Sequence, residues 1–439
     1  MTVTFAGSKT EGMTGSILSV PWGSGAGSAV SEEDERGEGE GGEGDEEKGI
    51  GSRTSHGRRA SPARASLMDV RYDHPSLLHV LRAAPYDAAH DLIAVGGDHE
   101  VEVLHISDAV VTPLACFNVG SRITALAWSP RAVSPSSSDH WLVELVAASA
   151  DFGLHLLTKT TDQPEVIFPF GGGLSGHHGP VNDVSFCGGR APDNSRYVAT
   201  VSDDKMLMVW DLQPTLDIPS TLPSPSPAPT PRPPASNTNI RPQPTAYAVP
   251  FLHPLVSLAS HPSTSNELVV ADSRGSVFLI DWRSDPSRSG VDLWPRGGAS
   301  VIELVDPRAL AEPASTARPG PIVNSIGASY GSRFAIWDLS KLHGGKPASI
   351  GLSYAQGVQR FRWCPTHTTY FALTPSPLAS KGAHLHVHNA AYIHAQPTPF
   401  TLGPRSSRIQ DFDWLATPGI PRIAAAIGRS VVVFFIGVD

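Results

Sequence analysis

The sequence contains few cysteines and no long apolar run. Only three of its 439 residues are cysteine, and their odd number and wide spacing argue against a disulfide framework and for a reducing compartment; they are Cys116, Cys187 and Cys364. No stretch of about 18 consecutive apolar residues is present, which argues against a transmembrane helix. The first residues also lack the basic start and apolar core of a secretory signal. Together these absences predict a protein without a membrane-inserted segment.

Sequence motifs for catalysis and nucleotide binding are lacking too. The glycine clusters Gly171-Gly172-Gly173 and Gly297-Gly298 are not followed by the Lys-Ser/Thr pair of a phosphate-binding loop. No Gly-x-Ser-x-Gly nucleophile turn occurs, and the basic residues form no dense stripe that would favour nucleic acid. We therefore expect no enzymatic activity, no cofactor or metal, and no nucleic-acid ligand.

Two segments carry too few apolar side chains to fold. Residues 1–65 include Ser31–Lys48, which has ten acidic and two basic residues and a net charge of −8, against −9 for the whole chain. In residues 213–246, the stretch Pro219–Pro234 alternates proline with small polar residues. These compositions predict a disordered acidic, glycine-rich leader and a disordered Pro/Ser-rich insertion that serves as a spacer. Binding of the acidic run to basic partners and phosphorylation of the spacer's Ser/Thr-Pro pairs remain open alternatives.

The remaining residues, 66–439, contain one segment with a recognisable repeat spacing. It opens with Gly176-His177, continues through the apolar run Val181–Phe186, then reads Val201-Ser202-Asp203-Asp204 and closes on Trp210-Asp211. These landmarks are typical of a WD repeat, which forms one blade of a β-propeller. Because the apolar faces of a blade need neighbours, one blade predicts a ring of blades.

Four polar side chains of this repeat are expected to act together. By resemblance to other WD repeats, a buried chain of hydrogen bonds links His177, Ser202, Asp204 and Trp210. Burial of such groups is tolerated only when each finds a partner, so the four are expected to depend on one another. A catalytic His177–Asp204 pair is the alternative, and the repeat pattern favours the structural role.

Six weaker units share the period of this repeat, so the sequence predicts seven units of three strands each. The units span Leu78–Ile106, Ile123–Leu157, Val181–Leu212, Pro254–Asp281, Val301–Leu339, Val358–His388 and Ile409–Ile436. A fourth, outer strand of each unit is too polar and variable to place. The last unit lacks sequence for an outer strand, and we expect Leu67–Tyr72 to supply it and close the ring. The predicted fold class is an all-β, seven-bladed WD40 β-propeller.

Two short motifs have a functional interpretation as an alternative to a purely structural one. His384, His386 and His388 alternate along one expected strand and therefore project from the same face. A His-x-His pair can bind zinc, but no Asp, Glu or Cys follows nearby, so we expect an exposed face of an outer strand. Ile280-Asp281-Trp282-Arg283 lies where ubiquitin-ligase substrate receptors carry Trp-Asp-x-Arg, although isoleucine replaces the first tryptophan. We interpret it as an ordinary blade end.

The order of one strong blade among weak ones resembles a known family. The pattern is similar to the small WD-repeat nucleoporin, of the thirty-seven-kilodalton class, in the Y-shaped outer-ring complex of the nuclear pore. The residues that carry the resemblance are Leu92–Gly97, Ile123–Pro130, Ala148–Asp151, Gly176-His177 through Val201–Asp204, Ile336–Asp338, Phe361–Trp363 and Asp439. The acidic leader and the Pro-rich insertion are not part of the family pattern.

The resemblance implies a non-enzymatic scaffold subunit at the nuclear envelope that supports pore assembly and nucleocytoplasmic transport. Its implied partner is the large propeller-plus-helical-solenoid nucleoporin on a short arm of the Y, together with other nucleoporins of that complex. The isolated protein is expected to be monomeric. No short motif identifies the partner-binding residues. The alternative function is a substrate receptor of a cullin-type ubiquitin ligase.

Overall fold

The computed structural model describes most of the chain after the predicted leader. The described residues are 70–107, 110–189, 191–214, 241–261, 264–283, 291–292, 299–304, 325–338, 346–376, 382–404 and 406–437, all within the compact unit Leu67–Asp439. The predicted leader, residues 1–65, and residues 215–240 of the predicted insertion lie outside this set. No helix in the described part of the chain is long and apolar enough to cross a membrane.

The described strands form seven four-stranded antiparallel sheets, each of which is one blade. The first three blades comprise β2 (Val80–Ala83), β3 (Leu92–Gly96), β4 (Glu100–Ser107) and β5 (Val110–Asn118); β6 (Ile123–Trp128), β7 (Leu142–Ser149), β8 (Leu154–Thr160) and β9 (Val166–Phe170); and β10 (Val181–Phe186), β11 (Tyr197–Ser202), β12 (Met206–Asp211) and β13 (Thr245–Pro250). Short 3₁₀ turns occur at η1 (Asp87–Ala89), η2 (Gly173–Ser175) and η5 (Ala390–Tyr392).

The other four blades have the same strand order. They comprise β14 (Leu255–Ser260), β15 (Glu267–Asp272), β16 (Val277–Asp281) and β17 (Val291–Asp292); β18 (Ala299–Leu304), β19 (Ser325–Tyr330), β20 (Arg333–Asp338) and β21 (Ser349–Leu352); β22 (Val358–Trp363), β23 (Tyr370–Pro375), β24 (His384–Asn389) and β25 (Thr398–Thr401); and β26 (Ile409–Trp414), β27 (Arg422–Ile427), β28 (Ser430–Phe435) and β1 (Val70–Asp73).

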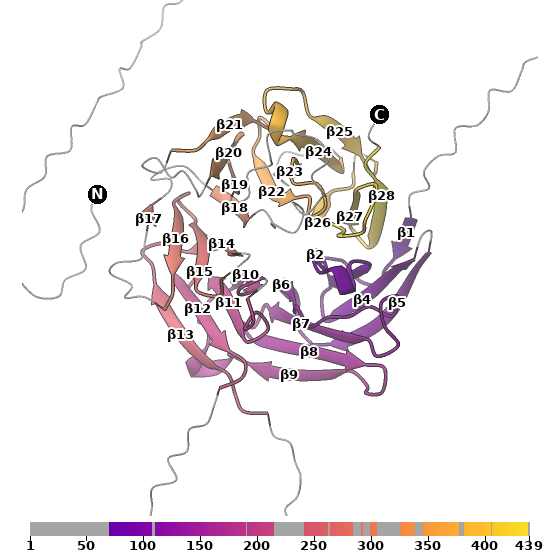
Figure 1. Cartoon of the computed structure of the whole chain (residues 1–439), viewed down its shortest axis with the longest axis vertical. Helices are drawn as coiled ribbons and strands as arrows, with labels where there is room; N and C mark the ends of the chain where they lie inside the picture. Colours follow the sequence, from indigo (N-terminus) through magenta and orange to yellow (C-terminus); the bar gives the residue numbers. More distant parts are fainter. Residues whose placement is uncertain are drawn as a thin grey trace, which may run out of the picture. The chain divides into compact units, whose positions relative to one another are not determined.

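The seven blades close into a ring, as predicted (Figure 1). The first strand of each blade lies innermost and contacts the first strand of the next blade, from β2 through β6, β10, β14, β18 and β22 to β26, which contacts β2 again. The seventh blade combines the two ends of the propeller, because β1 pairs antiparallel with β28. This pairing confirms closure by an N-terminal strand and gives β28 a hydrogen-bonded neighbour on its outer side.

The structure adds the outer strands that the sequence did not locate and moves one predicted boundary. The outer strands β5, β9, β13, β17, β21 and β25 each pair with the third strand of their own blade. β13 begins at Thr245, inside the range 213–246 predicted to be disordered, because Thr245 and Ala246 pair with Asp211 and Trp210 of β12. The three cysteines are free thiols.

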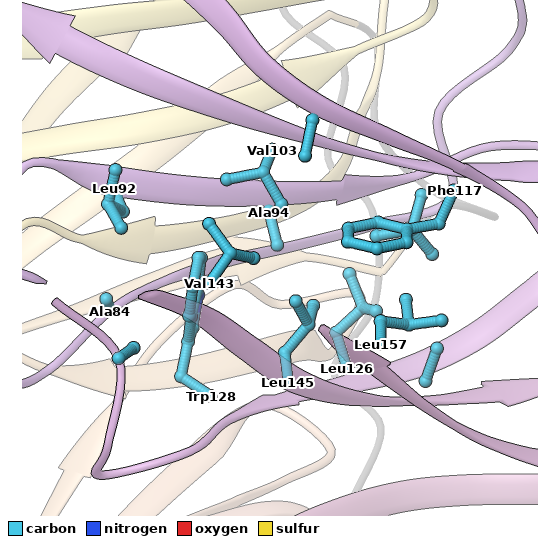
Figure 2. Close-up of a cluster of buried hydrophobic side chains, with 14 of the residues drawn as sticks. Ala84, Leu92, Ala94, Val103, Phe117, Leu126, Trp128, Val143, Leu145 and Leu157 are labelled. Carbon is cyan, nitrogen blue, oxygen red and sulfur yellow. The ribbon is translucent and has the colours of Figure 1, made fainter. Parts of the chain in front are cut away.

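Apolar packing between neighbouring blades explains why the inner strands read as continuous apolar runs. Every residue of β3 and of β11 is buried, since a blade covers each face of these strands. Figure 2 shows the cluster between the first two blades, where Leu126, Trp128 and Val143 face Ala94 and Phe117. Burial of one such side chain contributes about 1.5–3 kcal/mol, so the ring is stable only as a whole.

Candidate functional site: the blade lock and the central channel

The strongest repeat contains a buried chain of hydrogen bonds. The indole Nε1–H of Trp210 donates to Thr200 Oγ1 over 3.0 Å, and Thr200 Oγ1 lies 2.8 Å from Nε2 of His177. The other ring nitrogen of His177, Nδ1, lies 2.9 Å from Oδ2 of Asp204. All four groups are satisfied if Thr200 donates to Nε2 and Nδ1–H donates to the carboxylate. This tautomer assignment makes His177 neutral.

The protonation states follow from burial and from the bonds themselves. Burial lowers the pKa of His177 and outweighs the opposing influence of Asp204. Burial alone would raise the pKa of Asp204, but the backbone N–H of His178 and the imidazole of His177 outweigh it and hold the pKa below its usual value. The His177 side chain has no exposed surface, so the pair has a structural role inside the blade and does not contact a ligand. We call the hydrogen-bonded residues Trp210, Thr200, His177 and Asp204 the blade lock.

Ser202 lies outside this chain, contrary to the prediction. Its hydroxyl donates to the carbonyl oxygen of Gly179 over 3.0 Å and accepts from the backbone N–H of Asp204 over 3.2 Å, so it shapes the turn after β11. Thr200 occupies the position expected for Ser202. The two residues share one face of β11 because they are two apart. Strand register gives the signal that sequence reasoning missed: Met208, two residues before Trp210, pairs with Thr200.

A second buried polar cluster lines the centre of the ring and joins its ends. Asp411 on β26 accepts from the backbone N–H of Leu81 over 3.1 Å and from Nη1 of Arg82 over 2.7 Å, both on β2. Nε of Arg360 on β22 lies 3.3 Å from its other oxygen, and Nη2 of Arg362 lies 4.0 Å away. Burial alone would raise the pKa of Asp411, but the three guanidinium groups outweigh it and lower the pKa.

Two further aspartates connect neighbouring innermost strands. Asp183 on β10 accepts from the backbone N–H of Leu258 over 3.0 Å and from the Ser257 hydroxyl over 3.1 Å, both on β14. Asp413 on β26 accepts from the backbone N–H of Ala83 on β2 over 3.1 Å, and burial raises its pKa. Each carboxylate therefore bridges from its own blade to the next one around the ring.

Two indoles make the opposite connection, to the preceding blade. Nε1–H of Trp128 donates to the carbonyl oxygen of Arg82 over 3.0 Å, and Nε1–H of Trp414 donates to that of Arg362 over 3.1 Å. A cavity of about 230 Å³ opens between these innermost strands, and Asp183 and Asp413 are among its lining residues. Asp183 and Asp413 thus line this cavity and also hydrogen-bond to a neighbouring blade.

The histidines of β24 lie differently from the prediction of an exposed outer strand. β24 is the third strand of its blade, and its alternate side chains pack toward the fifth blade. His388 is buried, stacks on Phe371 with ring centroids 5.0 Å apart, and meets the edge of Phe334 at the same distance. His386 stacks on Tyr354 at 4.1 Å. In the described part of the chain, no group of three or more His, Cys, Asp or Glu side chains is arranged to hold a metal.

Arg283 lies at the end of the fourth blade and is 38% exposed. Its guanidinium stacks over the rings of Tyr197 and Trp282, with distances of 4.7 and 4.8 Å to their centroids. Nη2 lies 3.3 Å from Oδ2 of Asp193. The arginine is therefore held by aromatic faces and a carboxylate while part of it remains on the surface.

Comparison with known proteins agrees with this architecture. An uncharacterised WD repeat-containing protein of Schizosaccharomyces pombe is 28% identical over 114 residues, which cover 25% of this chain and 22% of that protein. The seven-bladed propeller and this partial match together support a WD-repeat protein. No protein-family model matches it, and the aligned part spans only about a fifth of the relative. A WD-repeat propeller of this kind is typically a scaffold for protein interactions.

Proposed function

We propose that this WD-repeat protein is a non-enzymatic scaffold subunit of the outer-ring Y complex of the nuclear pore. Its partner in this role is the large propeller-plus-solenoid nucleoporin of the short arm, and its location is the nuclear envelope. The observation that carries the proposal is the closed ring of seven blades, in which the third blade, the one with the strong sequence repeat, contains a buried hydrogen-bond network, as in the small WD-repeat nucleoporin that the sequence resembles.

The arrangement of polar side chains supports a scaffold more than an enzyme. The sequence offered His177 and Asp204 as a possible catalytic pair. In the structure the two side chains hydrogen-bond to each other, and His177 is buried inside the blade. Asp411 and Asp183, on innermost strands of the ring, bridge neighbouring blades to one another. Rigid blades then display outer strands and loops to a large partner, with a standard interface of about 1,600 Å² or more.

Affinity purification from nuclear extract tests this proposal. The tagged full-length protein is expected to recover the large short-arm nucleoporin in stoichiometric amounts, and imaging is expected to place the protein at the nuclear rim. Recovery of an unrelated stoichiometric partner, with no signal at the rim, contradicts the proposal.

One observation favours the substrate-receptor alternative enough to test it in the same experiment. Arg283 is partly exposed directly after Asp281-Trp282, at the blade end where ligase receptors carry their adaptor-binding arginine. If the protein is a ligase receptor, Arg283→Ala abolishes recovery of the ligase adaptor. If it is a nucleoporin, the same substitution leaves recovery of the nucleoporins unchanged.

A further inference from the structure

A groove of about 780 Å³ runs along the side of the propeller between the second and third blades. The lining residues come from the turn before β8 and the start of β8, from the end of β9 and the glycine-rich connection to β10, from Trp210 of β12, and from the residues that lead into and begin β13. The lining includes Asp151, His155, Phe170, Trp210, Gln243 and Thr245. We name this cavity the blade 2–3 groove.

Asp151 gives the blade 2–3 groove a negative charge. Among the lining residues, all of which the structure describes, Asp151 and His155 are the ionisable ones. Burial alone would raise the pKa of Asp151, but hydrogen bonds from the Ser149 hydroxyl and the Gly153 N–H outweigh it, so the carboxyl is ionised at neutral pH. Arg241, which precedes β13, packs over the Phe168 ring at 5.5 Å and is not among the lining residues.

His155 contributes no compensating positive charge. Because the Ser149 hydroxyl donates to Asp151, the 3.0 Å contact between Ser149 Oγ and His155 Nε2 requires the imidazole to donate. Nδ1 then carries the lone pair, and burial lowers the pKa of His155. The neutral imidazole leaves the groove with a net negative charge, which complements a cationic ligand.

The rim of the groove adds an exposed apolar contact. Gly171 has a φ of 63°, and a Cβ there would lie 2.9 Å from Cη2 of Trp210, so the backbone of this loop rests directly on the indole. The loop then turns through η2, between groove-lining residues Gly173 and Ser175, and presents Leu174 with 99% of its surface exposed. Leu174 therefore places one apolar side chain at the edge of the groove, within reach of an apolar residue of a ligand.

We propose that the blade 2–3 groove binds a lysine or arginine side chain of an extended segment of a partner protein, with Asp151 as the counter-ion and an apolar neighbour of the basic residue resting on Leu174. The proposal is independent of the nuclear-pore function. Charge complementarity selects the occupant, because a cation gains from Asp151 and an anion is repelled. The volume accommodates several residues of an extended chain, since ligand sites of about 300–1,000 Å³ hold drug-sized molecules.

Selection from a displayed library of random seven-residue peptides against the full-length protein tests the proposal. The enriched peptides are expected to share a lysine or arginine beside an apolar residue. Binding of an enriched peptide is measured by fluorescence anisotropy, and replacing its basic residue with uncharged citrulline or glutamine is expected to weaken binding at least about tenfold.

Matched variants of the protein assign the binding to this groove. Asp151→Asn keeps the hydrogen-bond acceptor and removes the charge, and it is expected to weaken binding about tenfold at an unchanged melting temperature. Asp162→Asn, at an exposed aspartate in the β8–β9 connection of the same blade, is the control and is expected to bind as the unmodified protein does. Leu174→Gln is expected to reduce the preference for an apolar neighbour.

Three outcomes overturn the proposal. The first is enrichment of peptides without a basic residue. The second is equal peptide binding by the Asp151→Asn and Asp162→Asn variants. The third concerns the arginines in residues 49–65, which could fill the groove in place of a partner. If deletion of residues 1–66 raises peptide binding severalfold and a synthetic peptide of residues 49–66 competes, the occupant is the chain's own leader and not a partner.

Discussion

Asp411 holds the seam of the ring, and its replacement by asparagine tests how the ends of the propeller are joined. The side chain has no exposed surface and receives a backbone N–H and a guanidinium from β2 and a second guanidinium from β22. Asparagine keeps the shape and removes the negative charge. Arg82, Arg360 and Arg362 then share Asp183 and Asp413 as the remaining nearby carboxylates.

The expected cost of this substitution is large for a single change of atom type. Removing one partner of a buried ion pair destabilises a protein by about 3–5 kcal/mol, because the remaining charge stays buried without compensation. The entropy of unfolding grows with chain length, so a loss of about 4 kcal/mol in a propeller of this size lowers the melting temperature by about 5 °C. Differential scanning calorimetry of the full-length protein measures both quantities.

The control for Asp411→Asn is Asp413→Asn in the same strand. The Asp413 carboxyl accepts from two backbone N–H groups, and burial raises its pKa, so replacing it removes less charge interaction and costs less. Adding Arg360→Gln to Asp411→Asn removes one uncompensated cation and is expected to recover part of the lost stability. An Asp411→Asn protein that melts with the unmodified one would refute the assignment of the seam to this carboxylate.

Two further predictions concern the blade lock and the buried histidine. Thr200→Val is expected to lower the free energy of unfolding, measured by urea denaturation, by about 3 kcal/mol, because it leaves Trp210 and His177 without their hydrogen-bond partner. Ser202→Ala is expected to lower it by about 1 kcal/mol. The reverse order would place Ser202, and not Thr200, in the blade's hydrogen-bond network. Burial lowers the pKa of His388 from 6.5 to about 4, so the unfolded chain takes up a proton that the folded one does not. Stability is therefore expected to fall by about 3 kcal/mol from pH 6.5 to 4, and His388→Phe should flatten the pH dependence over this range.

The sequence predicted the ring because its signals are periodic. Inner strands such as β3, β7, β11 and β15 are buried on both faces, so their sequences, for example Leu92–Val95, are largely apolar. The outer strands lack this constraint. β13 is exposed at all but one of its positions, and its sequence therefore resembles a loop. This physical difference explains why three strands of each blade were located and the fourth was not.

The polar interior was predicted less completely, because its partners are set by register and not by spacing along the chain. Thr200 could have been identified from its pairing with Met208, had the register been known. Asp183 and Asp411 carried a signal that went unused. Each is the third residue of its innermost strand, in Val-Asn-Asp-Val and Ile-Gln-Asp-Phe. An aspartate at that position faces the next blade, and the bonds from Leu258 and Leu81 show what it does there.

A substitution can abolish binding to a partner either by destabilising the fold or by altering the contact surface, and the position of the substituted residue distinguishes the two. A change at Asp411 or Trp210 acts on contacts between or within blades, so it lowers binding and melting temperature together. A change at an exposed position such as Leu174 or Arg283 alters the displayed surface while the blade beneath keeps its contacts. Loss of partner recovery therefore identifies an interface only when the variant melts normally.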